Sequence, residues 1–340
     1  MRAVSTKPIK AVLLAALALL PAVTGWLVRE LRTTAGQPSA PLFIKVEKGL
    51  SARGVIGRLR EAGLVRSPLA MRLACRAFYP DESFKAGEYR FSPPIGAKAV
   101  LFQIFAGKVH LEAVSVPEGL TGEEIAVLLR ADDADGAAAF RKAFLETDLI
   151  ADLDPAAKDL EGYLFPDTYH LPRRASEAEI VEAMVAEFRK VFDEDRRLRA
   201  AELGLGVRGT VTLASLIEEE TALAEERPLV SAVFHNRLKI GMKLDCDPTV
   251  AYALKRAGRY TGRLLLRDLK FESPYNTYLH AGLPPGPICS PGQASLDAAL
   301  RPAAEGYLYF VARGDGGHHF SRTLAEHLEA VRRFRALKKR

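Results

Sequence analysis

One stretch, Thr210 to Leu223 (TVTLASLIEEETAL), constrains this chain more than any other. Its pattern predicts a single helix that is apolar in its first half and ends in three consecutive glutamates. At about 100° per residue, Glu220 continues the apolar stripe, whose other members are Leu213, Leu216 and Ile217. Glu219 falls on the polar side of the same helix, and Glu218 falls on a stripe that is partly apolar.

A carboxyl group on the apolar stripe would be desolvated and would lie near the negative end of the helix dipole. Both effects favour the protonated form, which a general acid needs. Glu220 is therefore the candidate acid, with Glu218 as the second choice. The stretch alone leaves an ordinary alternative open, in which all three glutamates end a charged surface helix in water.

The N-terminal region contains an apolar run from Ala11 to Val28 without a charged residue, preceded by basic residues. Its length predicts a transmembrane anchor with the N-terminus in the cytoplasm. A cleaved signal peptide is the alternative. Either reading places the bulk of the chain outside the cytoplasm.

Composition and pattern together predict an α+β protein with several domains. The 340 residues are 48% hydrophobic and 26% charged, as in folded proteins. We expect a cytoplasmic stub and anchor at 1–32, a linker at 33–40, and a small module of two strands and three helices at 41–108. The region 109–340 should be mainly helical, with a β-hairpin formed by Gly306–Ala312 and the segment His318–Phe320.

Several kinds of binding site and catalytic motif are absent from the sequence, and their absence limits the possible functions. No Lys/Arg stripe interleaved with aromatic residues is present, so nucleic acid is not an expected partner. No HExxH, CxxC pair, GxSxG or P-loop is present, and His318 and His319 alternate across a strand, so neither a metal nor a cofactor is expected. What remains is a carboxyl-centred site among proline-stiffened loops, which is typical of enzymes that cleave glycosidic bonds.

Seven motifs occur in order along the second half of the chain. They are EGYLFPDTY at Glu161, ASLIEEET at Ala214, NRL at Asn236, CDPTVAYAL at Cys246, SPYNTY at Ser273, GLPPGPICSPG at Gly282 and GYLYFVARGDGGHHF at Gly306. Together they resemble the endolytic murein transglycosylases, also called the YceG-like family. In that family the glutamate before the threonine is catalytic, and this position is Glu220 here.

The resemblance implies cleavage of nascent peptidoglycan strands between N-acetylmuramic acid and N-acetylglucosamine, leaving 1,6-anhydro ends. Glu220 would act first as acid and then as base, so a second catalytic carboxylate is unnecessary. The residues expected to contact the substrate are Glu218, Asn236, Asp247, Thr249, Tyr275, Asn276, Tyr278 and His318.

The resemblance also implies a LysM-like module at 41–108, a single-pass location in the inner membrane, and penicillin-binding synthases as partners. It places Cys246 and Cys289 in loops around one groove, where a disulfide is predicted, with Cys75 buried and free. The alternative is that Cys246 and Cys289 pack separately as small apolar side chains. Two other functions stay open at this point. One is a non-catalytic wall-binding scaffold, and the other is a pyridoxal-dependent lyase, although neither a Schiff-base lysine nor a phosphate cradle is visible.

Overall fold

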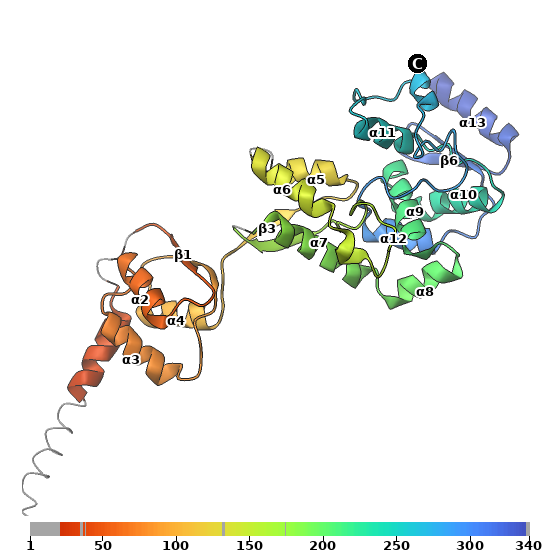
Figure 1. Cartoon of the computed structure of the whole chain (residues 1–340). Helices are drawn as coiled ribbons and strands as arrows, with labels where there is room; N and C mark the ends of the chain where they lie inside the picture. The colour runs from red at the N-terminus through yellow and green to blue at the C-terminus, as the bar shows by residue number, and fades with distance from the viewer. Residues whose placement is uncertain (1–20, 35–36, 38, 131–132, 174, 338–340) are drawn as a thin grey trace, which may run out of the picture. The chain divides into compact units, whose positions relative to one another are not determined.

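The computed structural model of this chain describes residues 21–34, 37, 39–130, 133–173 and 175–337 (Figure 1). These residues divide into two compact units. The first unit ends at Glu112 and also takes in the residues of one later strand from His170 onward, and the second unit contains the rest. The protein is mixed α+β and mostly helical, as predicted.

The first unit contains the small module. Its elements are β1 (Leu42–Val46), α2 (Ala52–Glu61), α3 (Pro68–Phe78), β2 (Gly87–Phe91) and α4 (Ala97–Phe105). The two strands pair antiparallel, with Leu42 opposite Phe91. The hydroxyl groups of Ser51 and Ser67 accept hydrogen bonds from the first turns of α2 and α3, which fixes where both helices begin. Every strand and helix predicted for this segment is present.

Residues 21–32 are helical and belong to the first unit. Leu31 is buried in the core of the module, and Leu27 packs against that core. The first ten residues of the predicted anchor, from Ala11 to Leu20, lie outside the described residues. Within the described part, no single helix is long and apolar enough to cross a membrane, whereas α8 (Glu194–Glu202) and α9 (Gly206–Glu220), bent by 90°, pass the same test as a pair.

A strand pair and a group of helices follow the module along the chain. The strand β3 (Leu111–Ser115) pairs with β4 (Thr168–Pro172). The helices are α5 (Gly122–Arg130), α6 (Ala134–Phe144), the short η1 (Thr147–Ile150) and α7 (Glu177–Val191), and α6 packs against both α5 and α7. Thr121 with Glu124 and Ser176 with Glu179 form capping boxes at the starts of α5 and α7.

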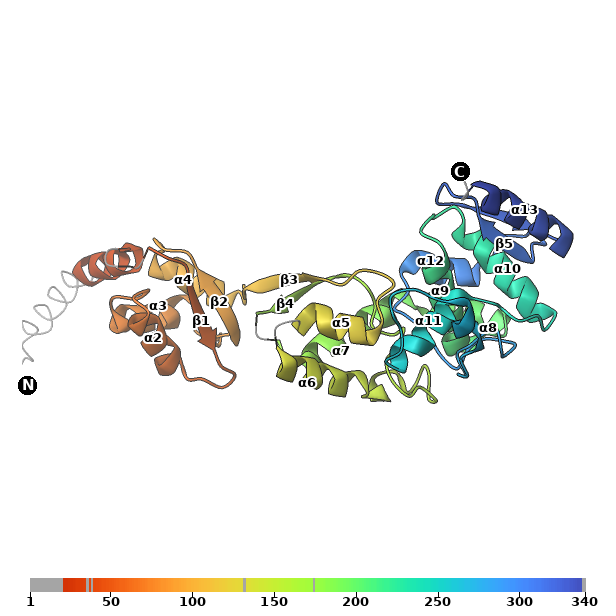
Figure 2. The ribbon, with the colours of Figure 1, turned by 90° about the horizontal axis from the view of Figure 1, so that it is seen from above.

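The rest of the second unit is built around α9, which packs against α8, α10, α11 and α12 (Figures 1 and 2). Every residue from Thr210 to Ile217 is buried, so the apolar half of the predicted helix is a core element. The other elements of this part are α10 (Arg227–Lys239), α11 (Asp247–Arg256), η2 (Leu266–Lys270), α12 (Gln293–Leu300), β5 (Tyr309–Ala312), β6 (His318–Ser321) and α13 (Leu324–Leu337).

Several boundaries differ from the sequence prediction. The helix α9 begins at Gly206 rather than Thr210 and ends at Glu220, because Thr221 adopts an extended conformation. One of the proline-stiffened loops expected from the sequence, Asp245–Thr249, instead contains the first turn of α11, in which Pro248 occupies a position that tolerates proline. The predicted hairpin is confirmed as β5 and β6, with Tyr309 opposite Ser321.

Candidate active site

Glu220 is the last residue of α9, where this helix meets α10 and the start of α11. Burial raises the pKa of its carboxyl group from 4.5 to about 7. The neighbouring carboxylates of Asp247 and Glu219 raise this pKa further, whereas a hydrogen bond with the Cys246 thiol and the charge of Arg237 oppose the rise. The desolvation expected from the helix stripe is therefore present in the structure.

Arg237 of α10 holds the loop that leads to this site. Its side chain is only 9% exposed, and its Nε donates to the carbonyl of Leu308 at 2.7 Å. Its Nη1 donates to the carbonyl of Leu244 at 2.8 Å and lies 3.5 Å from the Asp245 carboxylate. Asp245 has a φ of 47°, a left-handed conformation that is unusual outside glycine. The guanidinium thus braces the strained turn directly before Cys246.

Asp247 and Tyr278 form a polar pair beside Glu220. Asp247 is exposed, and its Oδ1 accepts a hydrogen bond of 2.6 Å from the Tyr278 hydroxyl. The charge of Asp247 acts on the Glu220 carboxyl, so the pair lies within electrostatic reach of it. Of the residues predicted to contact the substrate, these two are the ones that the structure brings to Glu220.

The other two glutamates at the end of α9 have different surroundings. Glu218 is 7% exposed at its side chain, pairs with Arg227 at 3.2 Å, and accepts from the backbone N–H of Gly292 at 2.9 Å. Glu219 is exposed as a residue, as its place on the polar stripe predicts. Its carboxyl is nevertheless poorly solvated, and this raises the pKa of Glu219, with Lys255 opposing.

Four other predicted contact residues use their polar atoms within the protein. The Asn236 amide donates to the carbonyls of Glu305 and Tyr307. The Asn276 amide donates to the carbonyls of Leu269 in η2 and of Phe271 directly after it. The Thr249 hydroxyl is buried and bonds the Cys246 carbonyl. The ring of His318 pairs with Glu226 at 2.7 Å. Their roles as substrate contacts stay predictions.

The predicted disulfide is absent, because Cys246 and Cys289 are both free and buried. Each thiol has a different glutamate as neighbour, Glu220 for Cys246 and Glu219 for Cys289. Cys75 is also free, but it is half-buried rather than buried, and desolvation raises its pKa to about 11. In the part of the chain that the structure describes, no three His, Cys, Asp or Glu side chains are grouped so that they could hold a metal.

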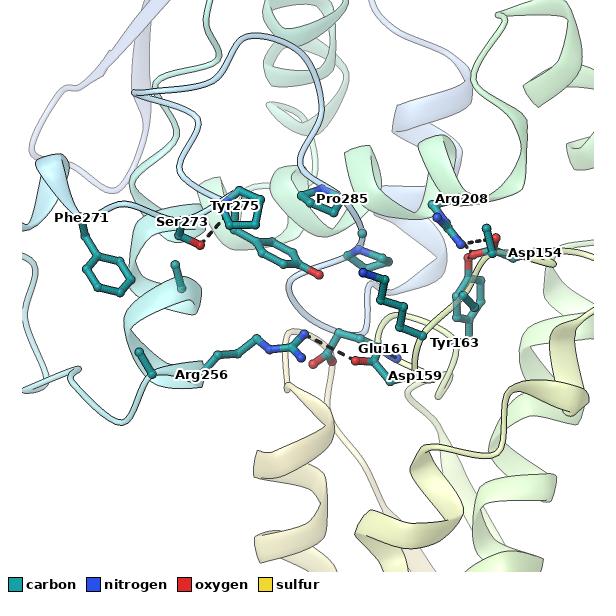
Figure 3. Close-up of a pocket in the computed structure, with 18 of the residues that line it drawn as sticks. Asp154, Asp159, Glu161, Tyr163, Arg208, Arg256, Phe271, Ser273, Tyr275 and Pro285 are labelled. Atoms are coloured by element: carbon teal, nitrogen blue, oxygen red, sulfur yellow. Dashed lines mark hydrogen bonds and ion pairs between the residues drawn. The ribbon is translucent and has the colours of Figure 1, made fainter.

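A pocket of about 670 Å³ lies toward the other end of α9 (Figure 3). Figure 3 shows Tyr275 and Arg256 on one side of it, and on the other side Arg208, which pairs with Asp154 at 2.6 Å. Tyr275 thus belongs to this pocket. Since Arg208 precedes Glu220 by twelve residues in one helix, their Cα atoms are about 18 Å apart along its axis.

Glu161 lines the same pocket and was missed by sequence reasoning. It is 6% exposed, and burial raises its pKa to about 7. One carboxylate oxygen accepts from the backbone N–H of Gly122 at the start of α5, and the other accepts from the Tyr252 hydroxyl at 3.1 Å. Both oxygens therefore accept hydrogen bonds. One of these bonds comes from a backbone N–H in the first turn of α5, which has no partner within the helix. The only sequence signal for it is its place at the head of the EGYLFPDTY motif.

The site defines the class of protein: a helical domain whose central helix, α9, ends in the desolvated acid Glu220. The hydrogen-bonded pair Asp247 and Tyr278 lies close to this acid. The chain belongs to the YceG-like family, whose model matches residues 44–333.

Individual relatives agree with this assignment. A protein of Bacillus subtilis (strain 168) named endolytic murein transglycosylase is 32% identical over 307 residues, which cover 86% of this chain and 84% of the relative. A protein of the same name from Streptococcus pneumoniae (strain ATCC BAA-255 / R6) is 27% identical, over 84% of this chain and 58% of its own length. A crystal structure of a yceG-like protein from Listeria monocytogenes matches with a TM-score of 0.58 and 29% identity, covering 85% of this chain and 98% of that one.

Proposed function

We propose that this protein is an endolytic lytic transglycosylase, with Glu220 as its acid and base. It cleaves the glycan strands of peptidoglycan between N-acetylmuramic acid and N-acetylglucosamine. The observation that carries the proposal is the burial of Glu220 at the end of α9, which raises its pKa to about 7. A carboxyl with a pKa near 7 is protonated in a large fraction of the molecules near neutral pH, whereas an ordinary glutamate is almost fully ionised there. The names of the relatives, murein transglycosylases, support the choice of substrate.

The reaction has two proton transfers. Glu220 first donates its proton to the glycosidic oxygen, and the bond between this oxygen and C1 of the muramyl residue breaks through an oxocarbenium-like state. The C6 hydroxyl of the same residue then forms a bond to C1 and gives its proton to the Glu220 carboxylate. The products are a 1,6-anhydro end and a free 4-hydroxyl end, and the acid is regenerated without water.

Asp247 and Tyr278 are proposed to orient the sugar beside the acid. The Tyr278 hydroxyl donates to one oxygen of Asp247, which leaves the exposed carboxylate able to accept from a sugar hydroxyl. The negative charge of Asp247 also favours a positively charged oxocarbenium state nearby. Glu218 is proposed to act indirectly, since its bonds to Arg227 and Gly292 fix the end of α9.

The pocket of Figure 3 is proposed to hold a part of the strand to one side of the scissile bond. The ring of Tyr275, which packs 5.0 Å from the buried ring of Tyr252, lines the pocket with Pro285 and Pro287, and these offer apolar faces of the kind that suit sugar rings. Arg208, on the far side of the pocket, lies about 18 Å from Glu220 along α9, so the pocket extends away from the acid on one side of the proposed cut.

We further propose that the chain is anchored in the inner membrane with residues after the linker on the external side, where nascent strands and their synthases lie. The apolar run from Ala11 to Val28 supports this. The 41–108 module is proposed to be LysM-like and to bind glycan, and its two strands, which flank two of its three helices, support this proposal.

The test is digestion of nascent peptidoglycan by the full-length protein and by its Glu220→Gln variant. The substitution keeps shape and hydrogen bonding but removes the proton, so cleavage should fall by about 10⁴-fold or more. Mass spectrometry of the wild-type products should find muramyl ends that lack one water relative to a hydrolysed sugar.

Glu225→Gln is the matched control, because Glu225 is exposed and outside the site, and it should cut normally. Ordinary reducing ends from the wild-type protein would mean hydrolysis and would end the single-carboxylate mechanism. Normal cutting by Glu220→Gln would remove Glu220 from the chemistry. Intact biological function without any cutting would favour the wall-binding scaffold.

A further inference from the structure

A hollow of about 550 Å³ lies between α2 and α3 of the small module. These two helices pack against each other (Figure 1). The hollow belongs to the first unit, whereas Glu220 belongs to the second. Its volume is within the range of about 300–1,000 Å³ that is usual for sites that bind small molecules. It is therefore a candidate binding site that is separate from the proposed active site.

The residues of α2 that line this hollow form one stripe of the helix. They are Arg53, Ile56, Gly57 and Arg60, which follow one another at intervals of three, one and three residues. Ile56 is buried and gives the hollow an apolar part of its wall, whereas both arginines are exposed. The two guanidinium groups therefore lie along the same side of α2, about two turns apart.

Helix α3 supplies the opposite wall with Pro68 and Arg72. Pro68 is the first residue of α3, so the positive end of the dipole of this helix lies at the hollow. Of the described residues that line the hollow, Glu61 alone is acidic, and three arginines with one glutamate give a formal charge of +2. We call this hollow, which is bordered by Arg53, Arg60 and Arg72, the arginine pocket.

The arginines of the pocket have no partner within the protein. Among the described residues, neither these three arginines nor Glu61 takes part in an ion pair or a side-chain hydrogen bond. Arg58 of the same helix differs, because it lies outside the pocket and pairs with Glu47 at 3.3 Å. Three like charges around one space repel one another, and an anion that enters this space is attracted by all three.

Gly57 keeps the α2 side of the pocket open. A Cβ atom at this position would meet no heavy atom of the surrounding protein within 4 Å. Glycine in the middle of a helix is less favourable than alanine, and the space around Gly57 would accept the larger residue. The glycine is therefore not required by packing, and its effect is to leave room between the arginines.

We propose that the arginine pocket binds a phosphate group, either a phosphate ester or a diphosphate. Guanidinium groups bond phosphate oxygens in pairs, and their arrangement on two facing walls suits a compact anion. A phosphate monoester carries a charge of about −1.5 to −2 at neutral pH, which matches the +2 of the pocket better than a carboxylate does. An uncharged sugar would leave the arginines without partners.

The charge of the whole module favours the same class of ligand. Residues 41–108 contain twelve basic and five acidic side chains, a net formal charge of +7. This charge raises the local concentration of anions at the module. The phosphate belongs either to a lipid headgroup or to a soluble compound, and the experiment distinguishes these two sources.

The experiment measures the binding of radiolabelled pyrophosphate to the full-length protein in nanodiscs of phosphatidylcholine. Arg72→Gln should weaken this binding by about five- to tenfold, since it removes a charged donor of paired hydrogen bonds. Arg76→Gln is the matched control, because Arg76 is exposed on the next turn of α3 and does not line the pocket. It should change the affinity by less than about twofold.

Gly57→Leu distinguishes a pocket from a basic surface. Leucine favours a helix, and its side chain enters the hollow without displacing packed atoms, so circular dichroism should show an intact fold. The variant keeps every charge, yet it should lose pyrophosphate binding. Unchanged binding by Gly57→Leu, or equal losses in Arg72→Gln and Arg76→Gln, would overturn the proposal. So would a wild-type protein that binds no pyrophosphate, or one in which acetate competes as well as inorganic phosphate does.

A last arm identifies the source of the phosphate. Phosphatidic acid in the same nanodiscs should compete with pyrophosphate if the pocket takes a lipid headgroup, and should leave the affinity unchanged if its ligand is soluble. Either result supports the phosphate site and assigns its source. None of these readouts depends on cleavage, so the result is independent of the proposed activity.

Discussion

The raised pKa of Glu220 predicts that its replacement by glutamine stabilises the fold in a pH-dependent way. In the unfolded chain this carboxyl ionises near 4.5, whereas in the folded protein it ionises near 7. Between these values the folded state holds a proton that the unfolded state has lost, so the free energy of unfolding falls as pH rises. Glutamine does not titrate, so Glu220→Gln avoids this loss.

The magnitude follows from the interval between the two pKa values. At about 1.4 kcal/mol per pKa unit, the full interval corresponds to about 3 kcal/mol as an upper limit. Glu220 is partly accessible, so we expect the variant to gain about 1–3 kcal/mol above pH 7 and nothing below pH 4.5. In a domain of this size each kcal/mol raises the melting temperature by about 2–4 °C.

The assay is urea unfolding of wild type and variant across that pH range, with Glu225→Gln as the control. Glu161 also has a pKa raised to about 7, and it gives both proteins the same additional pH dependence. The quantity to follow is therefore the difference between the two proteins. A difference that stays flat with pH, or a variant that is less stable at high pH, would refute the claim that the Glu220 carboxyl is desolvated.

Three further predictions concern residues around the site and the anchor. Arg237→Lys keeps the charge but loses the forked guanidinium that bonds the carbonyls of Leu308 and Leu244, so it should lower the free energy of unfolding by about 2–3 kcal/mol. Arg237→Met should in addition move the alkaline limb of the kcat/KM profile to higher pH, because the positive charge that lowers the pKa of Glu220 is gone. Tyr275→Ala should raise KM for long strands by about two- to tenfold with little change in kcat, whereas Tyr275→Phe, which keeps the ring, should not. Membrane fractionation should recover the full-length chain with the membranes, and a soluble external form that lacks the residues before about Thr33 would show a cleaved signal peptide instead.

The local sequence pattern was sufficient to predict those features that depend on residues close together in the sequence. The position of Glu220 on the buried side of α9 follows from periodicity within fifteen residues, and the whole order of the module follows from caps and strand patterns. The hairpin of β5 and β6 follows from the GDGG turn between them. In each case the signal and the structure lie in the same short segment.

Contacts between residues far apart in the sequence could not be predicted from the sequence alone. Asn236, Asn276 and Thr249 are polar residues in motifs, and the same residue types serve either to bind sugars or to brace loops. Only the fold shows that their hydrogen bonds end on carbonyls of the protein. The approach of Arg237 and Cys246 to Glu220 was not predicted, because it depends on how α10 and the start of α11 pack on α9.

The balance of effects on Glu220 fits the two tasks proposed for it. A carboxyl that must donate a proton in one step and accept one in the next works best when its pKa lies near the pH of its surroundings. Desolvation and Asp247 push this pKa upward, and by themselves they favour an acid that keeps its proton too well to regain the role of base. The Cys246 thiol and Arg237 stabilise the ionised form and limit the rise. The strained turn at Asp245, which Arg237 holds in place, is therefore part of how this chain tunes a single carboxyl for both steps.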